Sequence, residues 1–215
     1  MVDFSSIIDH TLLKANAEYK SFKTLCEQAV DNSFYSVCVP SFMVKTCKNA
    51  LAGTNVKVCT VVGFPLGNTD CLSKVAEAKY AVKHGADEID AVINISALKS
   101  KDLRYVDKEI SCLRKITDGK ILKIIVETAY LNEEEKTKIA KMILDNSVDF
   151  LKTSTGFAPE GAKIEDIKFF KKILKNSARI KASGGISSYE QAEALVRAGA
   201  NRLGTSKSLQ IINKK

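Results

Sequence analysis

Two lysines stand inside stretches that otherwise have the composition of buried strands. Lys152 follows Phe150 and Leu151, and Lys181 follows Ile180; each stretch continues into hydroxyl residues and a glycine. An unpaired ammonium is too costly to bury, so each lysine must be neutral, paired with a carboxylate or used in chemistry. A neutral lysine amine attacks carbonyl carbons and forms a Schiff base, which acts as an electron sink.

An aspartate occupies a comparable position in a third stretch. Side chains alternate along a strand, so the apolar residues Ile89, Leu151 and Ile180 are expected to face outward. Asp90 and the two lysines then point into the interior. Two ammoniums in one low-dielectric site disfavour each other's protonation, so one of them loses its proton more readily. The aspartate would supply a counter-ion and a proton relay.

A structural interpretation of the same residues stays open. Asp90 would form a buried ion pair with one lysine, while the other lysine would pair with Asp9 or Glu127. Buried ion pairs are weak stabilisers, however, so a cluster of several is more often functional than structural.

These residues are positioned by an alternation of apolar strand-like runs and amphipathic helices. The expected strands cover residues 6–9, 36–39, 56–62, 88–93, 121–126, 149–152, 179–182 and 201–204. Eight strand–helix units without a linker or a break in composition predict an α/β fold, a closed (β/α)8 TIM barrel in which residues 1–215 form a single domain. An open doubly wound sheet is the alternative, but no G-x-G-x-x-G motif follows the first strand.

Glycine turns follow the last two expected strands. Ser183-Gly184-Gly185 comes after the seventh and Gly204-Thr205-Ser206 after the eighth, the two places where barrels of this kind frequently bind phosphate. Either turn alone would be an ordinary loop, whereas the two together favour a phosphate site, which Thr155-Gly156 would extend.

The composition excludes several classes of protein. The net charge of +8 comes mostly from lysines interspersed with glutamates, which favours a solvated surface over a nucleic-acid site and leaves attraction for anionic small molecules. No stretch approaches the ~20 apolar residues of a membrane span. The six cysteines form no CxxC pair, which indicates reduced thiols in a cytoplasmic protein. His10 has no second ligand at metal spacing, so no metal is expected.

Motifs along nearly the whole chain resemble those of the deoxyribose-phosphate aldolases. The matching stretches are Asp-His-Thr-Leu-Leu-Lys (9–14), Val-Cys-Val-Pro (37–40), Val-Val-Gly-Phe-Pro-Leu-Gly (61–67), Ala-Asp-Glu-Ile-Asp-Ala-Val-Ile-Asn (86–94), Ile-Val-Glu-Thr (125–128), Phe-Leu-Lys-Thr-Ser-Thr-Gly-Phe (150–157) and Ile-Lys-Ala-Ser-Gly-Gly-Ile (180–186). The resemblance implies a (β/α)8 class I aldolase, a carbon–carbon lyase. It would interconvert 2-deoxy-D-ribose 5-phosphate with D-glyceraldehyde 3-phosphate and acetaldehyde, without a cofactor.

The resemblance also assigns roles to individual residues. Lys152 would form the Schiff base, Lys181 would promote loss of its proton, and Asp90 would complete the acid–base set through a water. Asp9 and Thr11 would act on the side of the substrate hydroxyl, Asp9 by holding Lys181. The remaining substrate-binding residues would be Cys38 in the pocket lining and, for phosphate, Gly156, Gly184, Gly185, Gly204 and Ser206.

The chain departs from the family pattern in two places. Some members end in a tyrosine that aids proton transfer, whereas this sequence ends Ile211-Ile212-Asn213-Lys214-Lys215. Some members carry a lysine after the Thr-Gly turn where this chain has Phe157, so the phosphate charge would be met elsewhere, with Lys207 as the candidate. Dimers are common in the family, so the resemblance implies a homodimer, although the sequence itself shows no interface signature and does not fix the oligomeric state.

Two other functions remain open at this point. One is an aldolase or lyase for a different phosphorylated sugar, which Cys38, Phe64 and Asn94 in the pocket lining would distinguish. The other is a non-enzymatic phosphosugar-binding protein, although binding alone has no need of two lysines inside strands.

Overall fold

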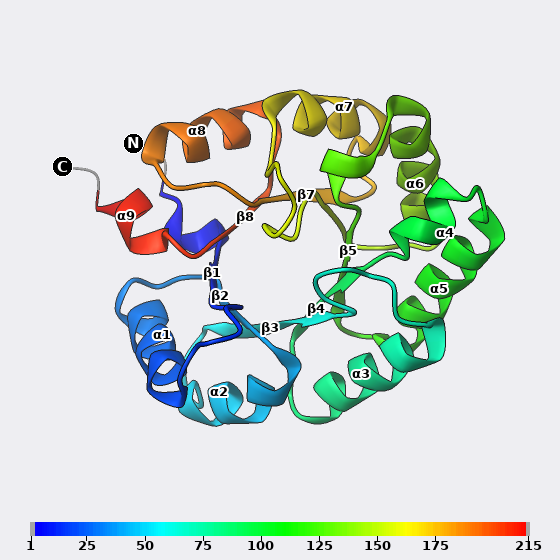
Figure 1. The fold of residues 1–215 in the computed structure, drawn as a ribbon. Coiled ribbons are helices and arrows are strands. Elements are labelled where there is room, and N and C mark those ends of the chain that lie inside the picture. Colours follow the sequence, from blue (N-terminus) through cyan, green and yellow to red (C-terminus); the bar gives the residue numbers. More distant parts are fainter. Residues whose placement is uncertain (1–2, 214–215) are drawn as a thin grey trace.

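Eight parallel strands close into one barrel in the computed structural model, which describes residues 3–213 (Figure 1). Each strand pairs with the next along the chain, and the last pairs with the first. The (β/α)8 fold expected from the sequence is confirmed. The strands are β1 (Ile8–Thr11), β2 (Ser36–Val39), β3 (Lys57–Val62), β4 (Glu88–Val92), β5 (Ile121–Ile125), β6 (Phe150–Lys152), β7 (Arg179–Ser183) and β8 (Arg202–Thr205).

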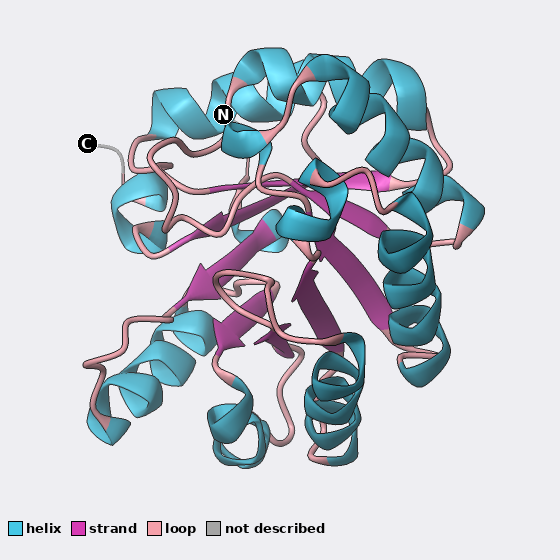
Figure 2. Ribbon diagram, turned by 45° about the vertical axis from the view of Figure 1, so that its right-hand side comes forward, coloured by secondary structure: helices cyan, strands magenta, loops and turns pink. Residues whose placement is uncertain are grey.

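Helices form an outer layer around the barrel (Figure 2). Apolar side chains on the outer faces of the strands, among them Ile89, Leu151 and Ile180, are buried in the core beneath these helices, which confirms their expected direction. The helices are α1 (Tyr19–Asp31), α2 (Val44–Ala50), α3 (Cys71–Lys83), α4 (Ile95–Lys99), α5 (Leu103–Ile116), α6 (Glu133–Asp145), α7 (Ile164–Leu174), α8 (Tyr189–Ala198) and α9 (Ser208–Ile212).

Several element boundaries differ from the sequence-based expectation, and one helix was not expected. The first strand begins later than expected, because Ser5–Ile7 forms a 3-10 turn before it. The sequence predicts a helix that begins at Asn16, a residue type favoured at helix starts, but helix α1 begins at Tyr19. Helix α4 was not expected, and the side chain of Asn94 caps it by accepting a hydrogen bond of 3.0 Å from the Ala97 N–H. Asn94, a predicted pocket residue, therefore caps a helix.

A buried ion pair outside the barrel supports the end of β4. The ammonium of Lys74 in α3 donates to Glu109 in α5 at 2.7 Å and to the carbonyl oxygen of Val92 at 2.8 Å, and both charged side chains are fully buried. The second carboxylate oxygen of Glu109 accepts from the N–H of Asn94 at 2.9 Å. This contact fixes the strand that carries Asp90 against two helices.

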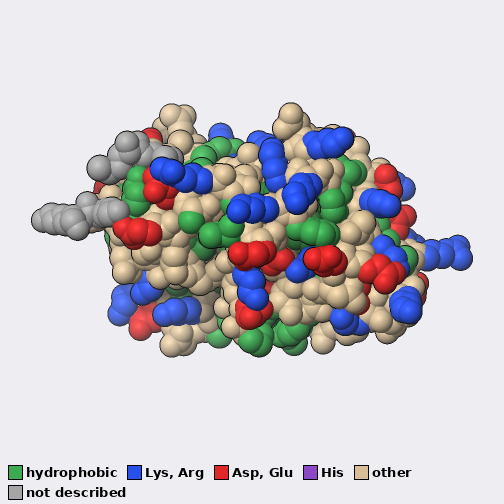
Figure 3. Space-filling model, turned by 90° about the horizontal axis from the view of Figure 1, so that it is seen from above, with side chains coloured by type: hydrophobic (Ala, Val, Ile, Leu, Met, Phe, Trp, Pro, Cys, Tyr) green, Lys and Arg blue, Asp and Glu red, His purple; other side chains and the backbone are tan. Residues whose placement is uncertain are grey.

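The surface and the cysteines agree with the compositional analysis. Basic and acidic side chains are mixed on the face drawn in Figure 3. All six cysteines are free. Among residues 3–213, no helix is both long and apolar enough to cross a membrane. Lys214 and Lys215, part of the ending that the sequence analysis noted for its lack of tyrosine, lie outside the described residues.

Candidate active site

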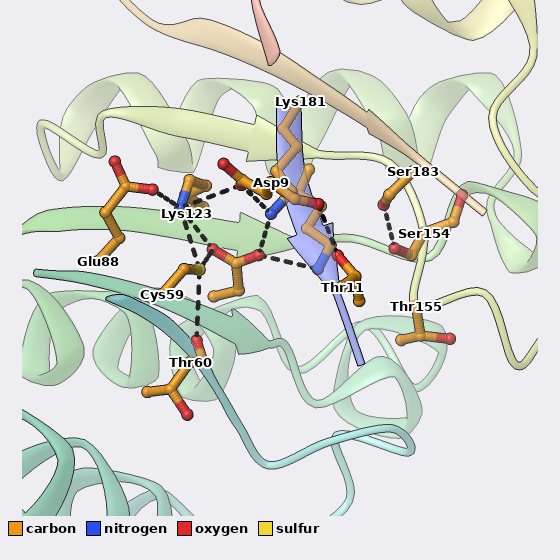
Figure 4. Close-up of polar contacts among 12 residues, drawn as sticks. Asp9, Thr11, Cys59, Thr60, Glu88, Lys123, Ser154, Thr155, Lys181 and Ser183 are labelled. Carbon is orange, nitrogen blue, oxygen red and sulfur yellow. Dashed lines mark hydrogen bonds and ion pairs between the residues drawn. The ribbon is translucent and has the colours of Figure 1, made fainter. Parts of the chain in front are cut away.

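Charged side chains fill the middle of the barrel, where bulky branched residues are usual. Figure 4 shows part of this set, with Lys123 between Glu88 and Asp9. Each member is at most 3% exposed, and all lie on the inner faces of strands. We call the set the charged column; its members are Asp9, Glu88, Asp90, Lys123, Lys152, Lys181 and Arg202.

Asp90 is the junction at which three lysines meet. Its Oδ2 accepts hydrogen bonds from Lys152 Nζ at 2.8 Å and from Lys181 Nζ at 2.7 Å. Its Oδ1 accepts from Lys123 Nζ at 2.8 Å. Burial alone would raise the pKa of Asp90, but the three ammoniums hold it well below its ordinary value. Asp90 is therefore a carboxylate.

The two deeper lysines of this junction are held as cations. Burial would lower the pKa of Lys181, yet Asp9 and Asp90 outweigh it and raise that pKa. The pKa of Lys123 is likewise raised, because Asp90 and then Glu88 outweigh the effect of burial. Lys152 differs from both in position, since it is the one of the three that reaches a pocket.

The pocket opens at the C-terminal end of the strands and has a volume of about 580 Å³. Active sites of (β/α)8 enzymes lie at this end. A larger cavity of about 860 Å³ lies at the opposite end, beneath Glu88. Beside Lys152, the ring of Phe64 lies 6.0 Å from the ammonium, and Phe157 packs edge-on against Phe64 at 5.4 Å between ring centroids. The amine therefore has an apolar wall on one side.

The other side of the pocket presents backbone donors. Among residues 3–213, the N–H groups of Gly156, Gly184, Gly185 and Ser206 have no acceptor on the protein. Gly184 must be glycine, because its φ is +86° and a Cβ would lie 3.0 Å from the Cα of Gly161. Converging free N–H groups bind anions, so this wall suits a phosphate.

The other predicted site residues take different places. Thr11 lines the pocket, and its hydroxyl donates to the carbonyl oxygen of Asp9 at 2.8 Å. Cys38 is fully buried and forms no part of the pocket lining. Gly204 lies within β8, where a Cβ would come within 2.8 Å of Lys181 Cε. Its missing side chain thus makes room for Lys181. Gly204 also lines the pocket, and its phosphate contact stays a prediction.

Three members of the charged column, Glu88, Lys123 and Arg202, are not among the predicted site residues. Glu88 is two residues before Asp90 and so shares its face of β4, and Lys123 stands alone among the apolar residues of β5. Arg202 begins β8. Lys123 stands inside an apolar strand as Lys152 and Lys181 do, so the same pattern indicates a paired or functional lysine.

Glu127 has a role that the sequence did not indicate. Its backbone is left-handed, with a φ of 54°, and its carboxylate accepts hydrogen bonds from both the N–H and the hydroxyl of Thr155. The Thr155 hydroxyl in turn accepts from the N–H of Phe157 at 3.0 Å. Glu127 therefore pairs with no lysine of residues 3–213 and holds the loop that carries Gly156.

The donor atoms near Asp90 include two thiols. Cys38, Cys59 and Asp90 offer ligand atoms that lie within 4.8 Å of one another. Both oxygens of Asp90 already accept bonds from lysine ammoniums, and Lys123 also lies 3.4 Å from the sulfur of Cys59. These contacts make the cluster better suited to proton transfer than to a divalent cation.

A lysine amine that faces a barrel pocket and shares a carboxylate with protonated lysines is the arrangement of a Schiff-base, class I aldolase. The sequence comparisons give the family. Residues 5–207 match the family model described as DeoC/LacD family aldolase. The chain belongs to this family.

The chain resembles curated aldolases over nearly the full length of both proteins. It is 50% identical over 213 residues to the deoxyribose-phosphate aldolase of Ureaplasma parvum, covering 99% of both chains. The enzyme of the same name from Finegoldia magna is 47% identical over 211 residues, covering 98% of this chain and 99% of that one.

Solved structures agree with these relatives. The structure of an aldolase named QR15 superimposes with a TM-score of 0.94 at 40% identity, covering 98% of this chain and 95% of that one. A tetrameric deoxyribose phosphate aldolase from Aeropyrum pernix gives a TM-score of 0.91 at 28% identity, covering 97% of this chain and 89% of that one.

Proposed function

We propose that this aldolase reversibly cleaves 2-deoxy-D-ribose 5-phosphate into D-glyceraldehyde 3-phosphate and acetaldehyde, through a Schiff base on Lys152. The observation that carries the proposal is the position of Lys152, whose amine faces the pocket and bonds to Asp90 Oδ2 together with Lys181. A phosphosugar-binding protein would gain nothing from such a buried charged arrangement, which is costly to desolvate.

The amine of Lys152 attacks the aldehyde carbon C1 of the open-chain sugar, and loss of water leaves an iminium ion. A base removes the proton of the C3 hydroxyl. The C2–C3 bond then breaks, its electron pair forms an enamine with the iminium, and glyceraldehyde 3-phosphate leaves. Protonation of the enamine at C2 and hydrolysis of the iminium release acetaldehyde and the free amine.

Asp90 and Lys181 supply the proton transfers in this scheme. Asp90 accepts a hydrogen bond from the Lys152 amine before that amine attacks the substrate. Lys181 stays protonated and hydrogen-bonded to the same carboxylate oxygen, so it can return a proton to the reacting groups. Asp9 holds Lys181 from the other side, and Thr11 contacts the substrate hydroxyl region. The Schiff base itself is the electron sink, so the proposal includes no metal and no organic cofactor.

The phosphate group would bind at the wall of free N–H groups formed by Gly156, Gly184, Gly185 and Ser206. Two exposed lysines, Lys14 and Lys207, also line the pocket, and among the described residues neither has an ion-pair partner. They would meet the charge that some family members meet with a lysine at the place of Phe157.

Replacing Lys207 with methionine is expected to raise KM for deoxyribose 5-phosphate about tenfold, the usual value of one charge-assisted hydrogen bond. The rate with unphosphorylated 2-deoxyribose should stay unchanged, because that substrate lacks the anion. Steady-state kinetics with both sugars measures the difference. Lys163→Met, at a lysine paired with Glu160 outside this pocket, is the control. An equal loss with both sugars would contradict the phosphate role.

Reductive trapping tests the proposed function directly. Acetaldehyde with borohydride should convert the iminium into a stable N-ethyl lysine, a mass increase that peptide mapping should place on Lys152 alone. Deoxyribose 5-phosphate with borohydride should label the same lysine, because its cleavage leaves the same iminium. No mass increase, or a label on Lys181, would remove the basis of the proposal.

The proposal also covers the cellular compartment, the pathway and the oligomeric state of the enzyme. We place it in the cytoplasm, in the catabolism of deoxyribose phosphate, because its six cysteines are free and because its substrates are small phosphorylated metabolites. We also propose a homodimer. The Aeropyrum pernix relative is tetrameric, so sedimentation equilibrium would decide the state of this chain.

A further inference from the structure

The charged column continues well below the residues that the mechanism uses. Lys123 bonds to Asp90 and also forms an ion pair with Glu88. Arg202 NH1 lies 3.1 Å from Glu88 and 2.7 Å from Asp9. Glu88 lines the cavity at the opposite end of the barrel. An unbroken chain of ion pairs therefore joins the base of the barrel to the amine of Lys152.

The charges of the column do not balance when every member is ionised. Four cations, Lys123, Lys152, Lys181 and Arg202, face three carboxylates, Asp9, Glu88 and Asp90, which leaves one excess positive charge in a buried interior. Loss of one proton makes the column neutral. Lys123, Lys181 and Arg202 each lie within ion-pair distance of two or more carboxylates of the column, whereas Lys152 lies within that distance of Asp90 alone among the described residues. Lys152 is therefore the cation that the column stabilises least, and it is also the one that faces the pocket.

We propose that Glu88 and Arg202, at the base of the barrel, set the pH at which Lys152 becomes a nucleophile, although neither touches the pocket. They act as positioning residues whose charges reach Lys152 through the column. The inference rests on the proposed role of Lys152 as the Schiff-base residue.

Charged or titratable side chains from the other strands also contribute to the electrostatic potential at Lys152. The effect of Glu88 and Arg202 must therefore be separated from the effects of these other groups. Glu127 follows the end of β5, but its carboxylate accepts a hydrogen bond from Thr155 and is not part of the column. The ring of Tyr35 lies against the Arg202 guanidinium at 3.5 Å. The groups facing the interior are Asp9 from β1, Cys38 from β2, Cys59 from β3, Glu88 and Asp90 from β4, Lys123 from β5, Lys181 from β7 and Arg202 from β8.

Opposite substitutions should move the acid limb of the pH–rate profile in opposite directions. Glu88→Gln removes a negative charge, so the proton on Lys152 is released more readily and the limb moves to lower pH. Arg202→Gln removes a positive charge and moves the limb to higher pH. A unit charge about 10 Å away shifts a proton equilibrium by roughly one pH unit at an effective dielectric constant of about 20.

The test measures the rate of labelling by acetaldehyde and cyanoborohydride as a function of pH, together with the pH profile of kcat/KM. The double variant Glu88→Gln/Arg202→Gln removes one charge of each sign and should return the limb close to that of the unmodified enzyme. Arg202→Lys keeps the charge and should leave the limb in place. Arg114→Gln, at a basal arginine that is paired with Asp149 outside the column, is the matched control and should not shift it.

The possible results separate this inference from the proposed function. Shifts of opposite sign that cancel in the double variant support it, because damage to packing would slow both variants without moving the limbs apart. Labelling of Lys152 with limbs that stay in place, move together or follow Arg114→Gln would overturn it. An enzyme that is not labelled at any pH would instead overturn the Schiff-base assignment. Should one single variant unfold, the other single variant compared with the double variant gives the same difference.

Discussion

Lys152→Met is expected to lower kcat/KM for deoxyribose 5-phosphate by about 10⁴-fold or more, because the covalent route is lost altogether. The fold should survive the change. Methionine has a similar length, Asp90 keeps its bonds to Lys181 and Lys123, and the column loses its one excess positive charge. The free energy of unfolding should therefore change by less than about 1.5 kcal/mol.

Steady-state kinetics and urea denaturation check the two halves of this prediction. Lys57→Met, at an exposed lysine that begins β3 at the far end of the barrel, is the control and should leave kcat/KM unchanged. Retention of more than about one hundredth of the activity by Lys152→Met would show that another group carries the reaction.

Asp90→Asn is expected to damage both catalysis and stability. Asparagine is nearly isosteric, but the change removes the negative charge that three buried ammoniums share and replaces one of the two accepting oxygens with an NH2 donor. Breaking such a buried pair typically costs about 3–5 kcal/mol of stability. Loss of the proton acceptor should reduce kcat by about 10³-fold.

The stability loss should depend on pH in a defined direction. The pKa of Asp90 is lower in the folded protein than its unfolded value near 3.9. Its contribution is therefore complete above that unfolded value and is lost only as the pH falls through the folded one. The difference in unfolding free energy between the unmodified protein and Asp90→Asn should persist at pH 5 to 8. Asp118→Asn, at an exposed residue, should change neither quantity.

Most of the fold could be predicted from the sequence because the periodicity of apolar residues specifies parallel strands and covering helices. Errors fell at places where local backbone geometry decides. The 3-10 turn at Ser5–Ile7 contains the same apolar residue types as a strand, and α4 is too short to show a helical period. Its cap at Asn94 could be taken equally well for a polar pocket residue.

The direction of Lys152 and Lys181 could be predicted, and so could Asp90 and Asp9 as their partners, but not that Asp90 binds both lysines at once. Alternation along a strand fixes which face Lys152 and Lys181 occupy. Which carboxylate they meet depends on the stagger between strands across the barrel, and that is set by the closed geometry as a whole. The structure brings both lysines to Asp90 and adds Lys123 to the same carboxylate. Glu127, an alternative partner in the sequence, instead holds Thr155.

Because Gly204 leaves the space that Lys181 occupies, the residues at positions 204 and 181 cannot be substituted independently of each other. A side chain at position 204 would push Lys181 away from Asp90, although no charged residue had been altered. Gly204 also lines the pocket, so it is an obvious position to randomise in a mutant library aimed at new aldehyde substrates. Such a library would disturb acid–base chemistry and substrate fit together. Directed evolution of this enzyme should therefore keep position 204 as glycine or randomise it jointly with position 181.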